Sequence, residues 1–117
     1  VPKELLVLFR PSVQPYLISL FRQDPARAFA GIHAPALIVQ GTHDIQVEVD
    51  DARALQRAKP DAELAIIAGM NHMLRITPAD FQAQLPSYDN PNLPLARALV
   101  ERVTTFVARS GSSRAGR

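Results

Sequence analysis

Two side chains in this sequence, Asp44 and His72, could do chemistry together. Asp44 follows the apolar run "PALIVQG" through the short turn "GTHD", and His72 follows a second apolar run, "AELAIIAG", through "GMNH". A carboxylate bound to one imidazole nitrogen fixes the tautomer of the ring and stabilises its protonated form. The other nitrogen is then free to act as a general base, which is the proton-handling half of nucleophilic catalysis.

Taken singly, each residue has a plainer interpretation. Aspartate is common in the turn after a strand because its carboxylate bonds nearby backbone N–H groups. A lone loop histidine is also more often structural than catalytic. The two together favour a functional pair, because chemistry in parallel α/β sheets gathers at the carboxyl ends of the strands. We therefore expect the Asp44 carboxylate to lie about 2.6 to 3.2 Å from a ring nitrogen of His72.

The elements that must position this pair form a strand–helix–strand unit. Residues 35–41 contain consecutive apolar side chains, typical of a parallel strand buried on both faces. Residues 48–58 predict a helix that ends just before a proline, and residues 62–69 predict the second strand. A crossover of this kind is right-handed. The sequence therefore predicts an α/β fold.

Helices are expected on either side of this unit. Residues 2–9 predict a short helix, Ser12 is a plausible N-cap for a second, and Asp24 a cap for a third that ends at Gly31. Residues 95–108 predict an amphipathic helix, and residues 109–117 a disordered tail. The second helix carries an apolar stripe, and so does the last. The stripe residues, expected to face inward, are Tyr16, Leu17, Leu20 and Phe21 in the former and Leu95, Leu99, Val103 and Phe106 in the latter. The first stripe could also be the inner wall of a substrate pocket.

The region after the second strand carries a further helix start and a turn-rich connection. Thr77, Pro78 and Asp80 resemble a capping box, with Asp in place of the usual Glu. "LPSYDNPNLP" then connects this segment to the last helix.

Composition excludes several classes of function. The chain has 117 residues, 47% hydrophobic and 21% charged, which is typical of one globular domain or part of a larger one. A net charge of +2 without a basic stripe interleaved with aromatic residues argues against nucleic-acid binding. The absence of cysteine excludes disulfides and thiolate chemistry. No apolar run reaches the roughly 20 residues of a membrane span. The sequence leaves localisation open.

The three histidines, with nearby acids, have the residue types of a metal site. No two of them have a ligand spacing such as H-x-x-x-H, so we expect neither a metal nor another cofactor. His43 is expected to be structural or to line a pocket, and His33 to be exposed ahead of the first strand.

The segment "PALIVQGTHDIQVEVDDARALQRAKPDAELAIIAGMNHML" resembles the last third of an α/β-hydrolase, and the resemblance runs from about residue 11 to residue 108. In that family the triad acid follows the penultimate core strand and the histidine follows the final strand. The resemblance places Gly41 with Asp44 and Gly69 with His72 at those positions. It implies the C-terminal portion of an α/β-hydrolase fold, its last two parallel strands with flanking helices. Downstream, "MNHMLRITPADFQAQLPSYDNPNLPLARALVERVTTFV" is similar to a bacterial esterase-like or serine-aminopeptidase-like branch.

The sequence departs from that family at the nucleophile. It contains no G-x-S-x-G, and no serine sits in a strand–turn–helix elbow between glycines. The family's first oxyanion-hole loop is missing as well. The serines are Ser12, Ser19, Ser87, Ser110, Ser112 and Ser113.

We therefore expect a C-terminal fragment of a serine hydrolase that acts on an ester, or on an amide or thioester, and is inactive alone. Residues 1–31 would be a helical segment ending a cap region, and residues 32–108 the βαβα part of the core. Met70, Asn71 and Met73 flank the histidine and could line an acyl pocket, although methionine often just fills space.

An alternative from a different class is a non-catalytic α/β module. Two parallel strands are not a stable sheet by themselves, and their unpaired edges favour association. On this interpretation the strand at residues 35–40 pairs with another chain, as in a homo-oligomer or a strand exchange, or with polypeptide outside these 117 residues.

Overall fold

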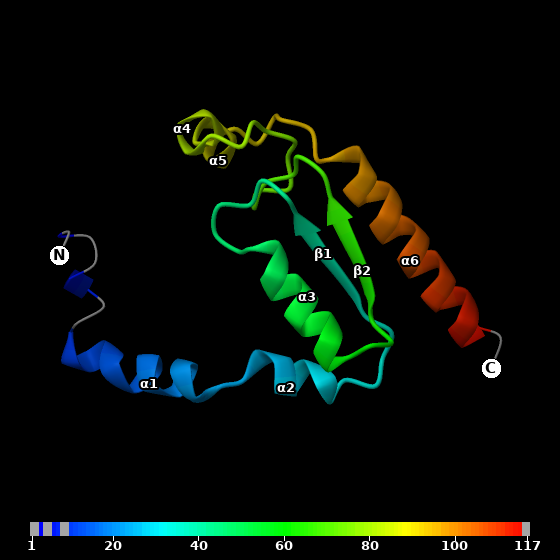
Figure 1. Cartoon of the computed structure of the whole chain (residues 1–117), viewed down its shortest axis with the longest axis horizontal. Helices are drawn as coiled ribbons and strands as arrows, with labels where there is room; N and C mark the ends of the chain where they lie inside the picture. Colours follow the sequence, from blue (N-terminus) through cyan, green and yellow to red (C-terminus); the bar gives the residue numbers. More distant parts are fainter. Residues whose placement is uncertain (1–2, 4–5, 8–9, 116–117) are drawn as a thin grey trace.

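Two parallel strands, β1 (Leu37–Gly41) and β2 (Glu63–Ile67), lie side by side at the centre of the molecule (Figure 1). The computed structural model describes residues 3, 6–7 and 10–115. The register runs from Leu37 opposite Glu63 to Gly41 opposite Ile67. The α/β class and the parallel pair predicted from the sequence are therefore confirmed, with each strand slightly shorter than expected.

Helix α3 (Val49–Ala58) makes the crossover between the strands and contacts both of them. Its start is fixed by a capping interaction in which Asp51 Oδ2 accepts the backbone N–H of Glu48 at 3.1 Å. Ala52 is buried on the face toward the sheet. Pro60 lies just past Lys59, the residue that caps the end of the helix. The predicted helix is thus present, within a residue of its expected bounds.

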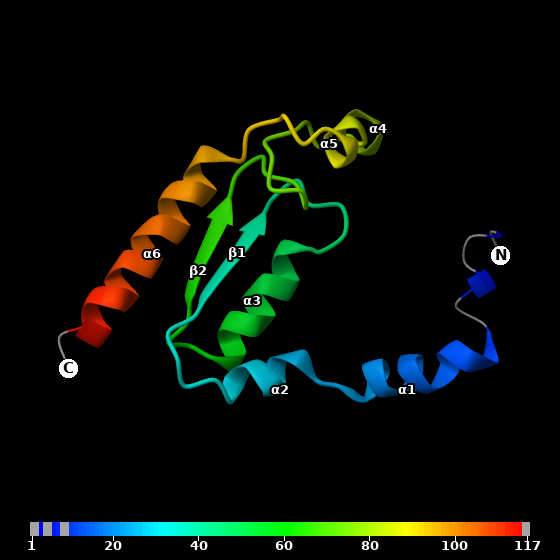
Figure 2. The same cartoon turned by 180° about the vertical axis from the view of Figure 1, so that it is seen from behind.

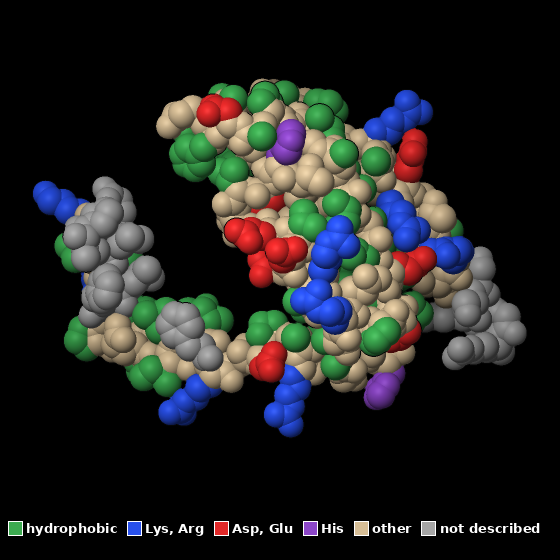
Figure 3. All heavy atoms as spheres, in the orientation of Figure 1, with side chains coloured by type: hydrophobic (Ala, Val, Ile, Leu, Met, Phe, Trp, Pro, Cys, Tyr) green, Lys and Arg blue, Asp and Glu red, His purple; other side chains and the backbone are tan. Residues whose placement is uncertain are grey.

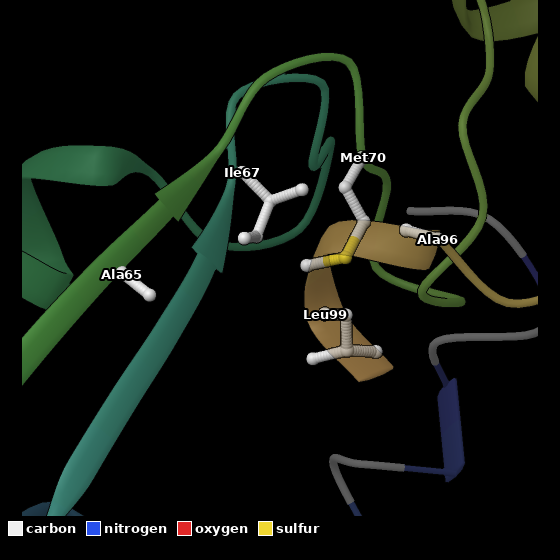
Figure 4. Packing of buried hydrophobic residues seen from close by; sticks show 5 residues of the cluster. All are labelled: Ala65, Ile67, Met70, Ala96 and Leu99. Atoms are coloured by element: carbon white, nitrogen blue, oxygen red, sulfur yellow. The ribbon is translucent and has the colours of Figure 1, made fainter. Parts of the chain in front are cut away.

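Helix α6 (Arg97–Ala115) covers the sheet on the side opposite α3 (Figure 2). The buried core joins α6 to the strand β2 and the loop that follows it. Figure 4 shows the Met70 side chain reaching between Ile67 of β2 and Leu99 of α6. The core cluster consists of Ala65, Ile67, Met70, Ala96 and Leu99, and Leu37 and Val39 of β1 pack against it. This core holds the loop after β2, and hence the neighbourhood of His72, to the last helix.

The end of α6 corrects the expectation of a disordered tail from residue 109. The helix continues to Ala115, and residues 116–117 lie outside the described part of the chain. Arg109 Nη2 donates to both carboxylate oxygens of Glu63, at 2.6 and 2.7 Å, which fastens this end of the helix to the start of β2. The polar composition of residues 109–117 predicts that this segment buries no apolar face. It does not exclude a helix that is anchored by an ion pair, as the one from Arg109 to Glu63 is.

The predicted inner face of this helix is only partly right. Leu99 is buried and Phe106 is half-buried, but Leu95 is 46% and Val103 39% exposed. The helix begins at Arg97, so Leu95 lies in the preceding loop rather than on the helical face.

The N-terminal helices form an arm that corrects a second expectation. A 3-10 turn, η2 (Pro11–Val13), leads into α1 (Gln14–Arg22), whose N-cap is Val13 rather than Ser12. In α1, Tyr16 is 66% and Leu20 45% exposed, and Figure 3 shows apolar side chains in view along the arm. The stripe is therefore not a buried face within the described residues, because α1 packs against η2 and stands away from the sheet (Figure 1).

The other N-terminal expectations differ in outcome. Helix α2 (Pro25–Ala30) packs against α3 and is capped by Asp24, which accepts the N–H of Arg27 at 3.2 Å, as predicted. The helix expected over residues 2–9 falls largely outside the described residues. No helix in the described part of the chain is both long and apolar enough to cross a membrane.

Two short helices, α4 (Phe81–Gln84) and α5 (Pro86–Asp89), lie beyond the carboxyl ends of the strands (Figure 1). Asp80 caps the first by accepting the N–H of Ala83 at 2.9 Å. A helix start is therefore present in this region, but it lies three residues later than the predicted capping box, in which Thr77 is the N-cap and Asp80 stands in the Glu position. The two short helices stand next to the loops that carry Asp44 and His72.

Candidate active site

The Asp44 and His72 side chains meet at the carboxyl ends of β1 and β2. Nδ1 of His72 donates to Asp44 Oδ2 over 2.9 Å, within the distance range expected from the sequence. The Asp44 side chain is only 8% exposed, whereas the imidazole of His72 is 41% exposed. The acid is thus enclosed, and the ring it holds is open to solvent.

The two carboxylate oxygens of Asp44 accept hydrogen bonds from different partners. Oδ1 accepts the backbone N–H groups of Gln46 and Val47 at 2.7 and 2.9 Å, which closes the turn after β1. Oδ2 is left for His72. The turn-forming interpretation is therefore confirmed for this residue, and the predicted contact with His72 is present as well. The turn fixes the carboxylate, and the fixed carboxylate holds the imidazole.

Several effects set the pKa of Asp44. Partial burial raises this pKa because it disfavours the charged form, and the bonds from Val47, His72 and Gln46 lower it. The hydrogen bonds together outweigh burial and hold the pKa of Asp44 below its ordinary value. The group is therefore a carboxylate at neutral pH, as a histidine-orienting acid must be.

His72 has one ring nitrogen committed and one open. Because the ionised Asp44 can only accept, Nδ1 carries the hydrogen of the neutral ring, and Nε2 then has a free lone pair. Within the described part of the chain, Nε2 has no hydrogen-bond partner. The ring thus has the orientation and the tautomer that a general base requires.

Close backbone contact brings the two loops together. A Cβ at Gly41 would lie 2.0 Å from the carbonyl oxygen of Met70, so only glycine allows this approach. The same carbonyl accepts the N–H of His43 at 3.0 Å, and Thr42 Oγ1 accepts the N–H of Gly69 at 2.8 Å. Gly69 itself has a φ of 77°, a conformation that suits glycine. Both motif glycines therefore have a physical role in setting the distance between the acid and the histidine.

A hollow of about 160 Å³ borders the pair. Of the three residues proposed from the sequence as pocket lining, Met70 and Asn71 border it, whereas Met73 does not. Leu74 also lines it, with a positive φ of 66° that is unusual for a side chain of this size. Met70 is in addition a core residue, so its main contribution is packing.

The other two histidines lie apart from this chemistry. His43 donates from Nδ1 to the carbonyl of Thr77 at 2.6 Å, which fits the structural role expected for it, and His33 is exposed. Among the described residues, no group of three or more histidine and acidic side chains is gathered to hold a metal ion.

No serine within the described residues is hydrogen-bonded to the imidazole. Ser12 and Ser19 are exposed on the N-terminal arm, and Ser110 lies near the far end of α6. Ser87 is buried, and its hydroxyl donates to the carbonyl of Gln84 at 2.6 Å. The side chains of Ser112 and Ser113 are outside the described part.

No family model, curated protein or solved structure matches this chain. The Asp44–His72 contact and its surroundings are therefore the basis on which a function can be inferred.

Three residues that each contact one of the two loops escaped the sequence interpretation: Gln84, Ser87 and Tyr88. They share one face of the α4–α5 segment, at the i, i+3, i+4 spacing of helical neighbours. That spacing is present in "QLPSY", but a polar helical face usually points to solvent, so nothing in the segment indicates that these side chains lie inside.

Proposed function

We propose that Asp44 and His72 are the acid and the general base of a serine hydrolase acting on an ester, or on an amide or thioester. One observation carries this proposal. A nearly buried carboxylate holds Nδ1 of His72 at 2.9 Å, while Nε2 stays open beside a hollow at the carboxyl ends of two parallel strands. The strand-end motifs that resemble those of α/β-hydrolases support the same assignment.

The reaction follows from the orientation of the ring. Nε2 of His72 takes the proton of a serine hydroxyl as its oxygen bonds to the substrate carbonyl carbon. The imidazolium is stabilised by Asp44 and gives that proton to the leaving group as the bond to the carbonyl carbon breaks. Water, deprotonated by the same nitrogen, then releases the acid product and frees the serine. General acid–base catalysis of this kind contributes roughly 10²- to 10⁴-fold.

The nucleophile and the oxyanion hole are proposed to lie in a polypeptide segment outside these 117 residues. The described serines are distant from the imidazole or, like Ser87, already hydrogen-bonded elsewhere. On this proposal the chain contributes the proton-handling half of the site and has no acyl-transfer activity by itself.

Labelling with a fluorophosphonate probe tests the assignment. A longer polypeptide that contains these 117 residues together with the proposed serine segment should be labelled and should hydrolyse p-nitrophenyl esters. The 117-residue chain should do neither. In the longer polypeptide, His72→Ala and Asp44→Asn should each lower the labelling rate by roughly 10²- to 10⁴-fold.

Matched substitutions separate the pair from general damage. His33→Ala and Asp50→Asn replace an exposed histidine and an exposed aspartate, and both should leave labelling unchanged. Labelling that survives His72→Ala would remove the assignment of the base. Strong labelling of the 117-residue chain would overturn the proposal that the nucleophilic serine lies outside these residues.

A second candidate function, association without catalysis, is favoured by a different observation. The arm exposes apolar side chains at Tyr16, Ile18 and Leu20, and the sheet within the described residues has two strands with an outer edge on each. Such surfaces favour self-association or partner binding. The mass of the chain by light scattering across a concentration series tests this candidate. A monomer at every concentration would argue against self-association, and a Tyr16→Ser, Leu20→Ser variant should weaken any oligomer that forms through the arm.

A further inference from the structure

The segment containing α4 and α5 presents three side chains to the loops of the candidate site. Leu85, between the two short helices, has helical dihedral angles of −54° and −41°, so the helical path continues through it. Gln84, Ser87 and Tyr88, called here the clamp residues, consequently lie on one face. Figure 1 shows this segment next to the ends of both strands.

Two clamp residues, Gln84 and Tyr88, bind the loop of Asp44, one at a residue before and one at a residue after the aspartate in sequence. Nε2 of Gln84 donates to the carbonyl of His43 at 2.7 Å, and Nε2 of Gln46 donates to the hydroxyl of Tyr88 at 3.1 Å. Gln84 is completely buried, and its amide also donates to the carbonyl of Pro78 at 2.9 Å. The residues immediately before Asp44 and two positions after it are thus tied to the same helical face.

The third clamp residue holds the loop of His72. Nδ2 of Asn71 donates to Ser87 Oγ at 2.8 Å, and that hydroxyl donates onward to the carbonyl of Gln84 at 2.6 Å. Asn71 and Ser87 are both buried, at 1% and 5% exposure. Asn71 also accepts the N–H of Arg75 through Oδ1 at 3.1 Å, so its amide is fixed at both ends.

The connection that the clamp residues make between the two loops matters because the imidazole of His72 is 41% exposed. Little packing around the ring itself holds it against Asp44. Buried amide and hydroxyl groups that lose their partners carry a desolvation penalty, so the contacts of the buried Gln84 and Ser87 resist any movement that breaks them. We propose that Gln84, Ser87 and Tyr88 are positioning residues that set the distance between Asp44 and His72. The effect of the clamp on hydrolysis rests on the proposed function, whereas its effect on the hydrogen bond does not.

The hydrogen bond can be measured in the 117-residue chain alone. The ¹⁵N chemical shifts of the His72 ring report the fraction of the neutral imidazole that carries its hydrogen on Nδ1. We expect this tautomer to predominate in the wild type and to lose roughly half of its population in Gln84→Met, which keeps the volume but removes the amide donors. Gln82→Met, an exposed glutamine on the same short helix, is the matched control and should leave the tautomer unchanged.

A milder variant keeps the test open if Gln84→Met does not fold. Tyr88→Phe removes one hydroxyl from a half-buried ring and should produce a smaller loss of the Nδ1–H tautomer in the same direction. Folded Gln84→Met and Tyr88→Phe chains that both keep the wild-type tautomer would overturn the positioning role.

Activity of the longer polypeptide gives the second measurement. Gln84→Met should lower kcat roughly ten- to hundredfold with little change in KM, the effect typical of groups that orient a functional histidine. If the wild type is inactive while the tautomer still responds to Gln84→Met, the hydrolase assignment fails and the clamp stands. If the wild type is active and Gln84→Met has the same kcat, the positioning role of the clamp residues is contradicted and the hydrolase assignment stands.

Discussion

Gly41 and Met70 touch through their backbones, so closely that a Cβ on residue 41 would lie 2.0 Å from the Met70 carbonyl oxygen and 2.6 Å from its carbon. The neighbour is main chain at the end of the buried core, and it cannot swing aside as a side chain would. This contact brings the turn after β1 against the loop after β2. It therefore controls how near Asp44 comes to His72.

Gly41→Ala should accordingly destabilise the protein by about 3 kcal/mol, because the loops must separate to admit the methyl group. Chemical denaturation measures the change. Gly111→Ala is the matched control, since its Cβ meets nothing within 4 Å, and it should stabilise helix α6 by about 0.5 to 1 kcal/mol. Equal effects at the two positions would contradict the close contact.

Asp44→Asn should remove part of the dependence of stability on acid pH. The folded-state pKa of Asp44 lies below its ordinary value of 3.8, so the unfolded chain binds more protons between the two values. This contribution is fully present above the ordinary value and is lost as pH falls through the folded-state pKa. Unfolding free energies measured from pH 6 downward should fall less steeply in Asp44→Asn than in the wild type, with the exposed Asp50→Asn as control.

Arg109→Ala should loosen the end of α6. The bond from Arg109 holds the pKa of Glu63 below its ordinary range and fastens the helix to the start of β2. Without it, amide exchange beyond position 109 should become roughly two- to fivefold faster, the size expected of an exposed ion pair. Arg97→Ala, which breaks an exposed pair with Glu101 at the other end of the helix, should leave those amides unchanged.

Leu74→Asn should raise the stability by about 0.5 to 1 kcal/mol. Leu74 has a φ of 66°, and asparagine tolerates this left-handed conformation better than leucine does. The residue is 40% exposed, so little packing is lost. Leu95→Asn changes a similarly exposed leucine without a positive φ, and thermal unfolding should show no gain there. The same result for both variants would show that the backbone at position 74 carries no strain.

The central unit was predictable because its signals are local. Consecutive apolar residues followed by a glycine indicate each strand, and Asp44 and His72 stand at fixed offsets from those ends. Helical periodicity at Tyr16 predicted a buried face that the structure shows exposed, because periodicity does not say what covers an apolar face. The helix beyond Ala108 is anchored by a long-range ion pair from Arg109 to Glu63, and such a pair leaves no pattern in the adjacent sequence. The clamp was hidden for the same reason, since Gln84 and Ser87 look like solvent-facing residues until their distant partners are known.

The parallel pairing of β1 with β2 also has a consequence for the order of folding. The strands and helix α3 occupy one continuous stretch, residues 37–67, so their contacts close a modest loop at low entropic cost. We expect this stretch to form early and to bring the ends of the two strands together. Helix α6 and the residues that grip the loops come later in the chain. Asp44 and His72 therefore become neighbours first, and the exact geometry of their bond is set only as the last third of the chain docks.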